Sequence, residues 1–112
     1  MFGAGGDRPK IRRTEMGLAA ARWVDHAVLT TDNPRSERAK DICADIAAAI
    51  DGAIPTEIVP DRREAIFLAL ELAGPGDVVA LLGKGHEGYI EEIGVRRPFS
   101  EQDVVAEFFR QK

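Results

Sequence analysis

The chain alternates between short apolar runs and longer segments in which apolar residues recur every three or four positions, and this alternation most constrains its fold. The runs at 26–30, 56–59 and 78–82 predict buried strands, and Met1-Phe2 predicts the stub of a first strand. The intervening segments have helical spacing. Strands that alternate with helices predict an α/β fold with a mostly parallel sheet and helices on both faces.

The same spacing predicts four helices, at 16–24, 36–49, 61–73 and from about Ser100 to Phe109. Asp61 is expected to cap the third helix, and Ser100 and Asp103 are candidate caps for the fourth. A hairpin of Tyr89–Ile93 and Val95–Phe99 is expected around Gly94. The residues expected to face the core are Met16, Ala19, Ala20, Trp23, Val24, Ala39, Ile42, Cys43, Ile46, Ile50, Ile66, Ala69, Leu70 and Ala73. Cys43 is therefore interpreted as a small buried residue and not as a nucleophile.

With 112 residues, of which 45% are hydrophobic, the chain is predicted to be a single domain that buries about two-thirds of its unfolded surface. A net charge of −4 without a dense basic stripe argues against nucleic-acid binding; the nearest approach to such a stripe is Arg8, Lys10, Arg12 and Arg13. The single cysteine fits a reducing compartment. Neither a signal peptide nor a membrane-spanning run is found, so we expect a cytoplasmic protein without membrane insertion.

Three loops rich in glycine, charge and histidine follow predicted strands, at Gly3–Arg13, Thr31–Ser36 and Gly83–Gly88. In parallel sheets the carboxyl ends of the strands share one edge, and ligands bind there. The three loops are therefore expected to form one site. The first predicted strand has only two residues before its loop, which is short for a strand, so we interpret the chain as a piece of a longer protein.

Two of these loops look like phosphate-binding loops but lack the required residues. In GAGGDR (3–8), the dinucleotide pattern would need glycine at the position of Arg8. In LLGKGHEG (81–88), a triphosphate loop would need glycine at Val78 and serine or threonine at Gly85. No triphosphate loop and no metal site are therefore expected in this chain. Taken alone, GAGGDR is somewhat better explained by a structural turn than by a ligand contact.

TDNPRSE (31–37) is the most informative segment. Pro34 fixes its own φ and favours an extended Asn33, so Asn33 is predicted to cap a helix whose first residue is Pro34. Arg35 would then lie in the first helical turn, where the macrodipole disfavours a cation. An anionic partner, such as a carboxylate held by the planar guanidinium, explains Arg35 better.

Together, GAGGDR with Arg13 and Met16, TDNPRSE and GKGHE, in this order and at these intervals, resemble the C-terminal domain of the Mur ligases, in particular of their meso-diaminopimelate-adding members. VPDRREAI (59–66) and PGDVV (75–79) extend the resemblance to nearly the whole chain. It implies a three-layer, Rossmann-like domain, here residues 1–112, of a three-domain ligase of peptidoglycan synthesis. A central ATPase domain of such a ligase binds ATP and Mg²⁺. The implied reaction converts a carboxylate of UDP-N-acetylmuramoyl-L-alanyl-D-glutamate to an acyl phosphate, which the amine of meso-diaminopimelate attacks.

The resemblance also implies residue roles. Arg35 would hold the distal carboxylate of diaminopimelate, and Arg8 another carboxylate. The distal ammonium would lie against Gly83 and Glu87. Asp32, Asn33 and Pro34 complete the diaminopimelate motif, and the candidates for nucleotide or interdomain contacts are Asp7, Arg13, Lys84 and His86. Lysine lacks the distal carboxylate, and lysine-adding relatives lack this arginine, so Arg35 favours diaminopimelate.

The chain departs from the family pattern after GDR, with Pro9 in place of aspartate, Arg12 in place of lysine and Thr14 in place of proline. Two alternatives stay open. One is a sibling ligase that adds another amino acid, such as glutamate or lysine, and the other is a stand-alone amino-acid-binding module without catalysis. The 112 residues by themselves are predicted to be inactive, because they lack the triphosphate loop.

Overall fold

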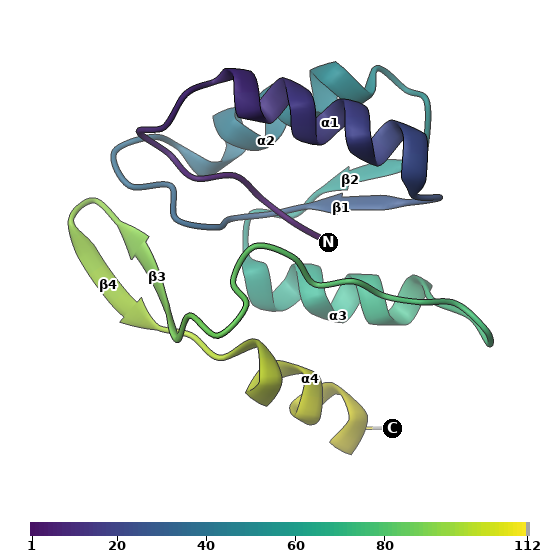
Figure 1. Ribbon diagram of the computed structural model, residues 1–112. Coiled ribbons are helices and arrows are strands. Elements are labelled where there is room, and N and C mark those ends of the chain that lie inside the picture. The colour runs from purple at the N-terminus through teal and green to yellow at the C-terminus, as the bar shows by residue number, and fades with distance from the viewer. Residues whose placement is uncertain (112) are drawn as a thin grey trace.

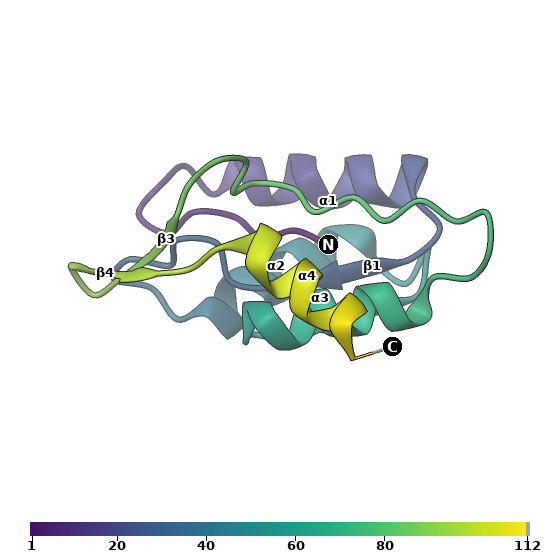
Figure 2. The same ribbon diagram turned by 90° about the horizontal axis from the view of Figure 1, so that it is seen from below.

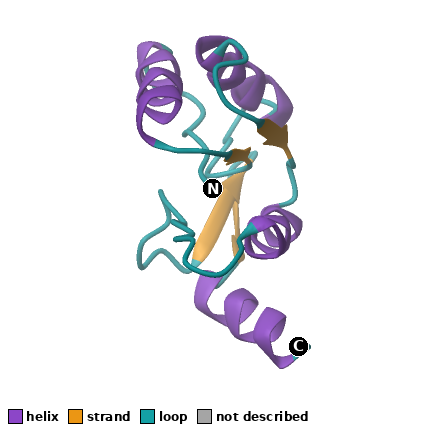
Figure 3. Cartoon of the chain, turned by 90° about the vertical axis from the view of Figure 1, so that its right-hand side faces the viewer, coloured by secondary structure: helices purple, strands orange, loops and turns teal. Residues whose placement is uncertain are grey.

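The computed structural model describes residues 1–111 as helices packed around short parallel strands, with a hairpin at one end (Figure 1). In chain order the elements are α1 (Ile11–Trp23), β1 (Ala27–Leu29), α2 (Ala39–Ile50), β2 (Thr56–Ile58), α3 (Arg62–Leu72), β3 (Tyr89–Glu92), β4 (Val95–Pro98) and α4 (Glu101–Arg110). Helices α1 and α2 cover one face of the strands, and α3 covers the other (Figure 3). The predicted α/β architecture is confirmed.

The sheet is parallel around β1. Ala27 lies opposite Thr56 of β2, and Leu29 lies opposite Ile58. On the other side of β1, Phe2 forms a parallel bridge with Leu29, so the predicted first strand exists as a stub. Strands β3 and β4 form the predicted antiparallel hairpin. Its turn requires positive φ at two successive residues, and Gly94 adopts such a value, 73°, without strain.

The segment 78–82 is not the buried strand that its sequence predicts. It belongs to no strand, and Val78 is 93% exposed. A strand needs a hydrogen-bonding neighbour along its length, whereas among residues 1–111 this segment bonds to the sheet only through Met1: the Met1 amino group donates to Ala80 O, and Leu82 N donates to Met1 O. Apolar composition alone could not reveal that the neighbour is so short.

The core lies on both faces of β1, as expected when successive strand side chains point in opposite directions. Ala27 and Leu29 face α1 and α2, while Val28 packs with Ala65 and Ala69 of α3. The larger cluster is formed by Phe2, Ala4, Ala20, Ala27, Leu29, Ile42, Cys43, Ile46 and Ile50. The interpretation of Cys43 as a buried residue is confirmed, and burial raises the pKa of its thiol to about 11.

The predicted inner faces of α2 and α3 are largely correct, whereas that of α1 is correct only for Ala20 and half-buried Met16. Trp23 is 75% exposed, with the guanidinium of Arg22 over its ring at 4.9 Å. Ala19 and Val24 are exposed as well, whereas the buried residues of α1 are Arg13, Gly17 and Ala20. The periodicity argument counts only apolar side chains, so it could not identify Gly17 or Arg13 as buried residues of α1. The half-buried members of the predicted set are Met16, Ala39, Leu70 and Ala73.

Gly17 is where α1 lies closest to α2. A Cβ added to Gly17 would lie 2.6 Å from Ala49 Cβ and 2.6 Å from Ile46 O. Neither of these atoms can move without shifting α2. Close packing of the two helices therefore requires glycine at this position.

Gly17→Ala is expected to lower the free energy of unfolding by about 1–3 kcal/mol, because overpacking outweighs the gain in helix propensity of about 1 kcal/mol. Urea unfolding followed by circular dichroism measures the change. Gly88→Ala is the matched control, because a Cβ there would meet nothing within 4 Å. A Gly17→Ala chain as stable as wild type would contradict the assigned close approach.

Candidate functional site

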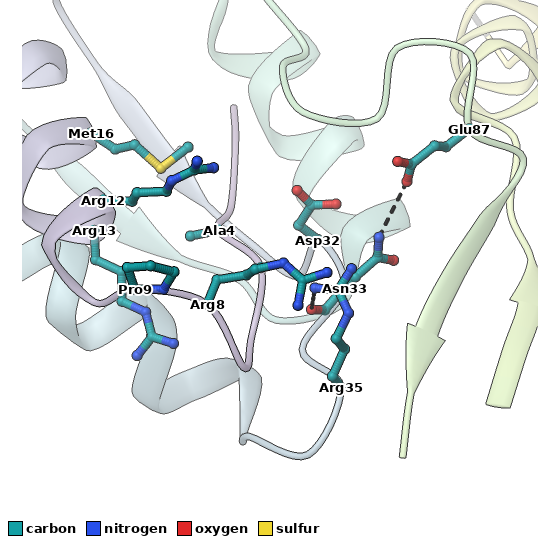
Figure 4. Close-up of a pocket in the computed structure, with 11 residues that line it drawn as sticks. Ala4, Arg8, Pro9, Arg12, Arg13, Met16, Asp32, Asn33, Arg35 and Glu87 are labelled. Atoms are coloured by element: carbon teal, nitrogen blue, oxygen red, sulfur yellow. Dashed lines mark hydrogen bonds between the residues drawn. The ribbon is translucent and has the colours of Figure 1, made fainter. Parts of the chain in front are cut away.

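The three predicted loops, Gly3–Arg13, Thr31–Ser36 and Gly83–Gly88, meet at one end of the molecule, beside the hairpin (Figures 1 and 2). They surround a pocket of about 230 Å³ (Figure 4). The residues that line it are Ala4, Gly5, Arg8, Pro9, Arg12, Arg13, Met16, Asp32, Asn33, Arg35 and Glu87. Among the candidate residues, Asp7, Pro34, Gly83, Lys84 and His86 do not line it.

Glycines let the first loop lie directly on the second. A Cβ on Gly3 would be 2.1 Å from Thr30 O, and one on Gly6 would be 1.8 Å from Pro34 O. Gly6 N also donates a hydrogen bond to Asn33 O at 2.8 Å. These glycines therefore serve loop packing, which is the structural-turn interpretation of GAGGDR.

The next two residues of this loop have different surroundings. The Asp7 carboxylate accepts hydrogen bonds from the hydroxyl and the backbone N–H of Ser36, and these bonds lower the pKa of Asp7. Arg8 is exposed, and its Nη1 donates to Asp7 O at 3.0 Å. In Figure 4 the Arg8 guanidinium points toward Asn33 and Arg35. Asp7 thus holds two loops together, and Arg8 presents charge to the pocket.

Asn33 does not cap a helix, so that prediction was wrong. Helix α2 begins five residues after Pro34, at Ala39, and Arg38 precedes it without a side-chain cap. The Asn33 side chain is used in tertiary contacts instead. Its Oδ1 accepts from Lys84 Nζ at 2.7 Å and from Glu91 N at 2.8 Å, and its Nδ2 donates to Glu87 Oε1 at 3.2 Å.

Arg35 consequently lies outside any helix, and the macrodipole argument does not apply to it. Its backbone has φ of 53° and forms a bridge to β3, where Arg35 N donates to Glu91 O at 3.1 Å. The guanidinium Nη1 donates to Gly6 O at 3.1 Å, and Nε lies 3.7 Å from Glu91 Oε1. No group among residues 1–111 is bonded to Nη2, so this edge of the guanidinium is available to an anion in the pocket.

Lys84 is buried beneath the site, with 2% of its surface exposed. Its ammonium lies 2.8 Å from Asp32 Oδ1, 2.7 Å from Asn33 Oδ1 and 3.3 Å from Glu87 Oε1. The second loop supplies two of these partners, and the third loop supplies the other. Lys84 therefore ties the two loops together. Gly83, with φ of 105°, places the chain against the Asp32 carboxylate.

Glu87 remains a carboxylate in this setting. Burial would raise the pKa of Glu87, but hydrogen bonds from Asn33 and Lys84 outweigh that effect, so its pKa lies below the ordinary value of 4.5. The lining of the pocket therefore includes both the guanidinium groups of Arg8 and Arg35 and the carboxylates of Asp32 and Glu87 (Figure 4). Such a dipolar lining suits a small zwitterion.

Two other candidates lie differently. Arg13 is buried, and its guanidinium is paired with Glu37 Oε2 at 2.7 Å and Asp45 Oδ2 at 2.8 Å. The hydrogen bonds from Arg13 and Asp7 also lower the pKa of Glu37. His86 is exposed at the tip of the third loop. Arg13 thus helps to fix the wall of the pocket by joining α1 to α2.

Sequence reasoning missed Arg62, a buried arginine at the start of α3 that bonds to backbone carbonyls below the site. A signal was present. Arg62 directly follows the predicted cap Asp61, whose Oδ1 does accept from Glu64 N at 2.9 Å. A cation in the first turn of a helix calls for a compensating partner, as was argued for Arg35.

A parallel α/β domain with a dipolar pocket at the carboxyl edge of its sheet is a small-ligand-binding domain in form. More narrowly, the chain belongs to the Mur ligase family: the family described as "Mur ligase, glutamate ligase domain" matches residues 1–85. The predicted family is thereby confirmed. Among residues 1–111, no helix is long and apolar enough to cross a membrane.

Curated relatives named UDP-N-acetylmuramoyl-L-alanyl-D-glutamate–2,6-diaminopimelate ligase are similar to nearly the whole chain. The protein from Aquifex aeolicus is 48% identical over 96% of the chain, and that from Chlorobaculum tepidum is 41% identical over 99%. A solved structure of a ligase with the same name superimposes with a TM-score of 0.91 at 40% identity, covering 98% of the chain and 23% of that structure. The chain spans about a fifth of these relatives, 22% of each.

Lys84→Met is expected to raise the pKa of Glu87, because the ammonium is lost while burial of the carboxylate remains. NMR titration of the Glu87 carboxyl measures the shift. A depressed carboxyl pKa stabilises the fold above its ordinary value of 4.5 and loses this effect as pH falls through the folded-state pKa. The difference in unfolding free energy between wild type and variant should therefore be largest near neutral pH. It should shrink as the pH falls through the folded-state pKa of Glu87.

Lys40→Met, which removes an exposed lysine from α2, is the matched control. It should leave the Glu87 titration unchanged. An unchanged Glu87 pKa in Lys84→Met would contradict the inference that the Lys84 ammonium electrostatically stabilises the contact between the second and third loops.

Proposed function

We propose that the chain is the amino-acid-binding domain of an ATP-dependent ligase that adds meso-diaminopimelate to UDP-N-acetylmuramoyl-L-alanyl-D-glutamate. The names of relatives that are 41–48% identical over at least 96% of the chain support this assignment. The parent would be a longer, cytoplasmic ligase of peptidoglycan synthesis, and residues 1–112 would be one of its domains. Its central ATPase domain would be the partner of this chain.

The observation that carries the proposal is the free edge of the Arg35 guanidinium in a pocket that also holds the ionised Glu87. One end of meso-diaminopimelate is a zwitterion, with a carboxylate and an ammonium on the same carbon. Arg35 would hold that carboxylate, and Glu87, beside Gly83, would hold that ammonium. Each charge-assisted contact contributes about 1.5–3 kcal/mol.

The other residues of the pocket would complete recognition. Arg8, which points toward the same region, would contact a further carboxylate of the amino acid. Asp32 and Asn33 would complete the amino-acid motif as residues of the pocket wall. Both contact the Lys84 ammonium there. Buried Pro34 would keep the backbone that precedes Arg35 in place.

Lysine would be rejected because it lacks the distal carboxylate. Its binding would leave Nη2 of Arg35 without an anionic partner in the pocket. Loss of a required polar partner in such a site supports discrimination on the order of 10⁴-fold. This argument favours diaminopimelate over the sibling-ligase alternative.

Two features of the chain favour binding of ATP and Mg²⁺ mainly by other parts of the parent ligase. Among residues 1–111 there is no cluster of three or more His, Cys, Asp or Glu side chains that could hold a metal ion. Neither glycine-rich loop has the residues of a triphosphate loop, and two glycines of the first are used for packing. We therefore assign ATP and Mg²⁺ to other parts of the parent ligase, and to this chain the holding and orientation of the amino acid.

Arg35→Ala is expected to weaken binding of meso-diaminopimelate by about 10–100-fold, the loss that corresponds to one charge-assisted contact. Titration calorimetry or NMR titration of the chain at millimolar ligand measures the affinity, with lysine and glutamate as competitors. Arg38→Ala removes an exposed arginine whose side chain has no hydrogen-bond or ion-pair partner among residues 1–111, and it is the matched control.

Equal binding of diaminopimelate by Arg35→Ala and wild type would overturn the role of Arg35. Tighter binding of lysine or glutamate by the wild-type chain would instead support a sibling ligase.

The 112-residue chain is expected to show no ATP-dependent ligation, because it lacks the triphosphate loop. Phosphate release in the presence of the muramoyl dipeptide and meso-diaminopimelate measures the activity, with a full-length relative as the positive control. Turnover above background would contradict the assignment of ATP-dependent chemistry to other parts of the parent ligase.

A further inference from the structure

Arg62 is a buried cation that does not line the pocket, although it lies directly beneath it. It is the first residue of α3, and 1% of its surface is exposed. Burial and the positive end of the helix dipole both disfavour a cation here, so strong partners are required. Glu101, from the first turn of α4, lies 2.9 Å from Nε and 2.8 Å from Nη2.

The remaining donors of Arg62 bond to two backbone carbonyls. Nη1 donates to Thr31 O at 2.7 Å, and Nη2 donates to Leu82 O at 3.0 Å. Thr31 immediately precedes Asp32, and Leu82 immediately precedes Gly83. One planar guanidinium therefore holds the bases of the second and third loops, which carry all the diaminopimelate candidates except Arg8.

The two loops are thus joined at two levels. Lys84 joins them at the pocket wall through Asp32, Asn33 and Glu87. Arg62 joins them below, by donating to the main-chain carbonyls of Thr31 and Leu82. Rotation of the side chains of the two loops cannot break these bonds. Because the donors of a guanidinium have fixed mutual positions, the Arg62 contacts also set the separation of the two loops.

We propose that Arg62 is a positioning residue for the amino-acid site, which sets the distance between the segments Asp32–Arg35 and Gly83–Glu87. This inference rests on the proposed function of that site. Arg62 acts on the ligand only through the two loops, and Glu101 extends the same connection to α4. Helix α4 is thereby linked to the spacing of Arg35 and Glu87.

Arg62→Lys tests the proposal, because an ammonium keeps the charge but cannot reproduce the planar fork. We expect affinity for meso-diaminopimelate to fall about tenfold, the effect of displacing one charge-assisted contact. The amide NMR signals of Asp32, Asn33, Arg35 and Gly83–Glu87 should shift, and the pKa of Glu87 should move toward its ordinary value of 4.5 as its contact with Lys84 loosens.

Arg63→Lys is the matched control, since Arg63 is the next residue and pairs with Glu107 on the surface. It should change neither the affinity nor the Glu87 titration. Glu101→Gln is a milder second variant, which keeps Arg62 and should shift the same signals less. It decides the matter if Arg62→Lys fails to fold.

Unchanged loop signals and an unchanged Glu87 pKa in the folded variants would overturn the positioning role, even if stability falls. These readouts do not need ligand. A wild-type chain that does not bind meso-diaminopimelate would therefore defeat the proposed function, while the spacing of the loops could still be measured.

Discussion

A charge buried at the carboxyl edge of the sheet must be neutralised by the protein itself, and the Lys84 ammonium imposes this requirement on the whole site. Asp32, Asn33 and Glu87 meet it together. Their side chains come from two loops that follow different strands, so satisfying one ammonium brings the loops into a single arrangement. The pocket exists in its observed form because this charge cannot be left without partners.

Close backbone approach provides the second constraint. Gly3 and Gly6 let the first loop lie on the carbonyls of Thr30 and Pro34, and Gly17 lets α1 approach α2. These contacts place Arg8 at the mouth of the pocket and Arg13 in its wall. Glycine contributes here through the absence of a side chain. A resemblance to phosphate-binding loops was therefore a poor guide to what these glycines do.

Much of the fold could be predicted, because β1, β2 and α2 follow directly from apolar periodicity and the caps of α3 and α4 from Asp61 and Ser100. The failures share a cause. Trp23 and the 78–82 run are apolar but exposed, whereas Arg62 and Lys84 are charged but buried. The polarity of a side chain sets the free-energy penalty for burying it. Whether hydrogen bonds and ion pairs offset that penalty depends on partners that are distant in the sequence.

By itself, the sequence determined most of the helices and strands, with the exception of the 78–82 run, because these elements follow from local spacing, and it indicated which loops meet. Only the tertiary structure decided how the site residues are used. Asn33 seemed a helix cap, yet its side chain bonds to Lys84 and Glu91, and Arg35 is aimed by β3 and not by a helix. Local rules could not foresee this, since hydrogen-bonding groups take whichever partners burial leaves to them, and those partners lie more than fifty residues away.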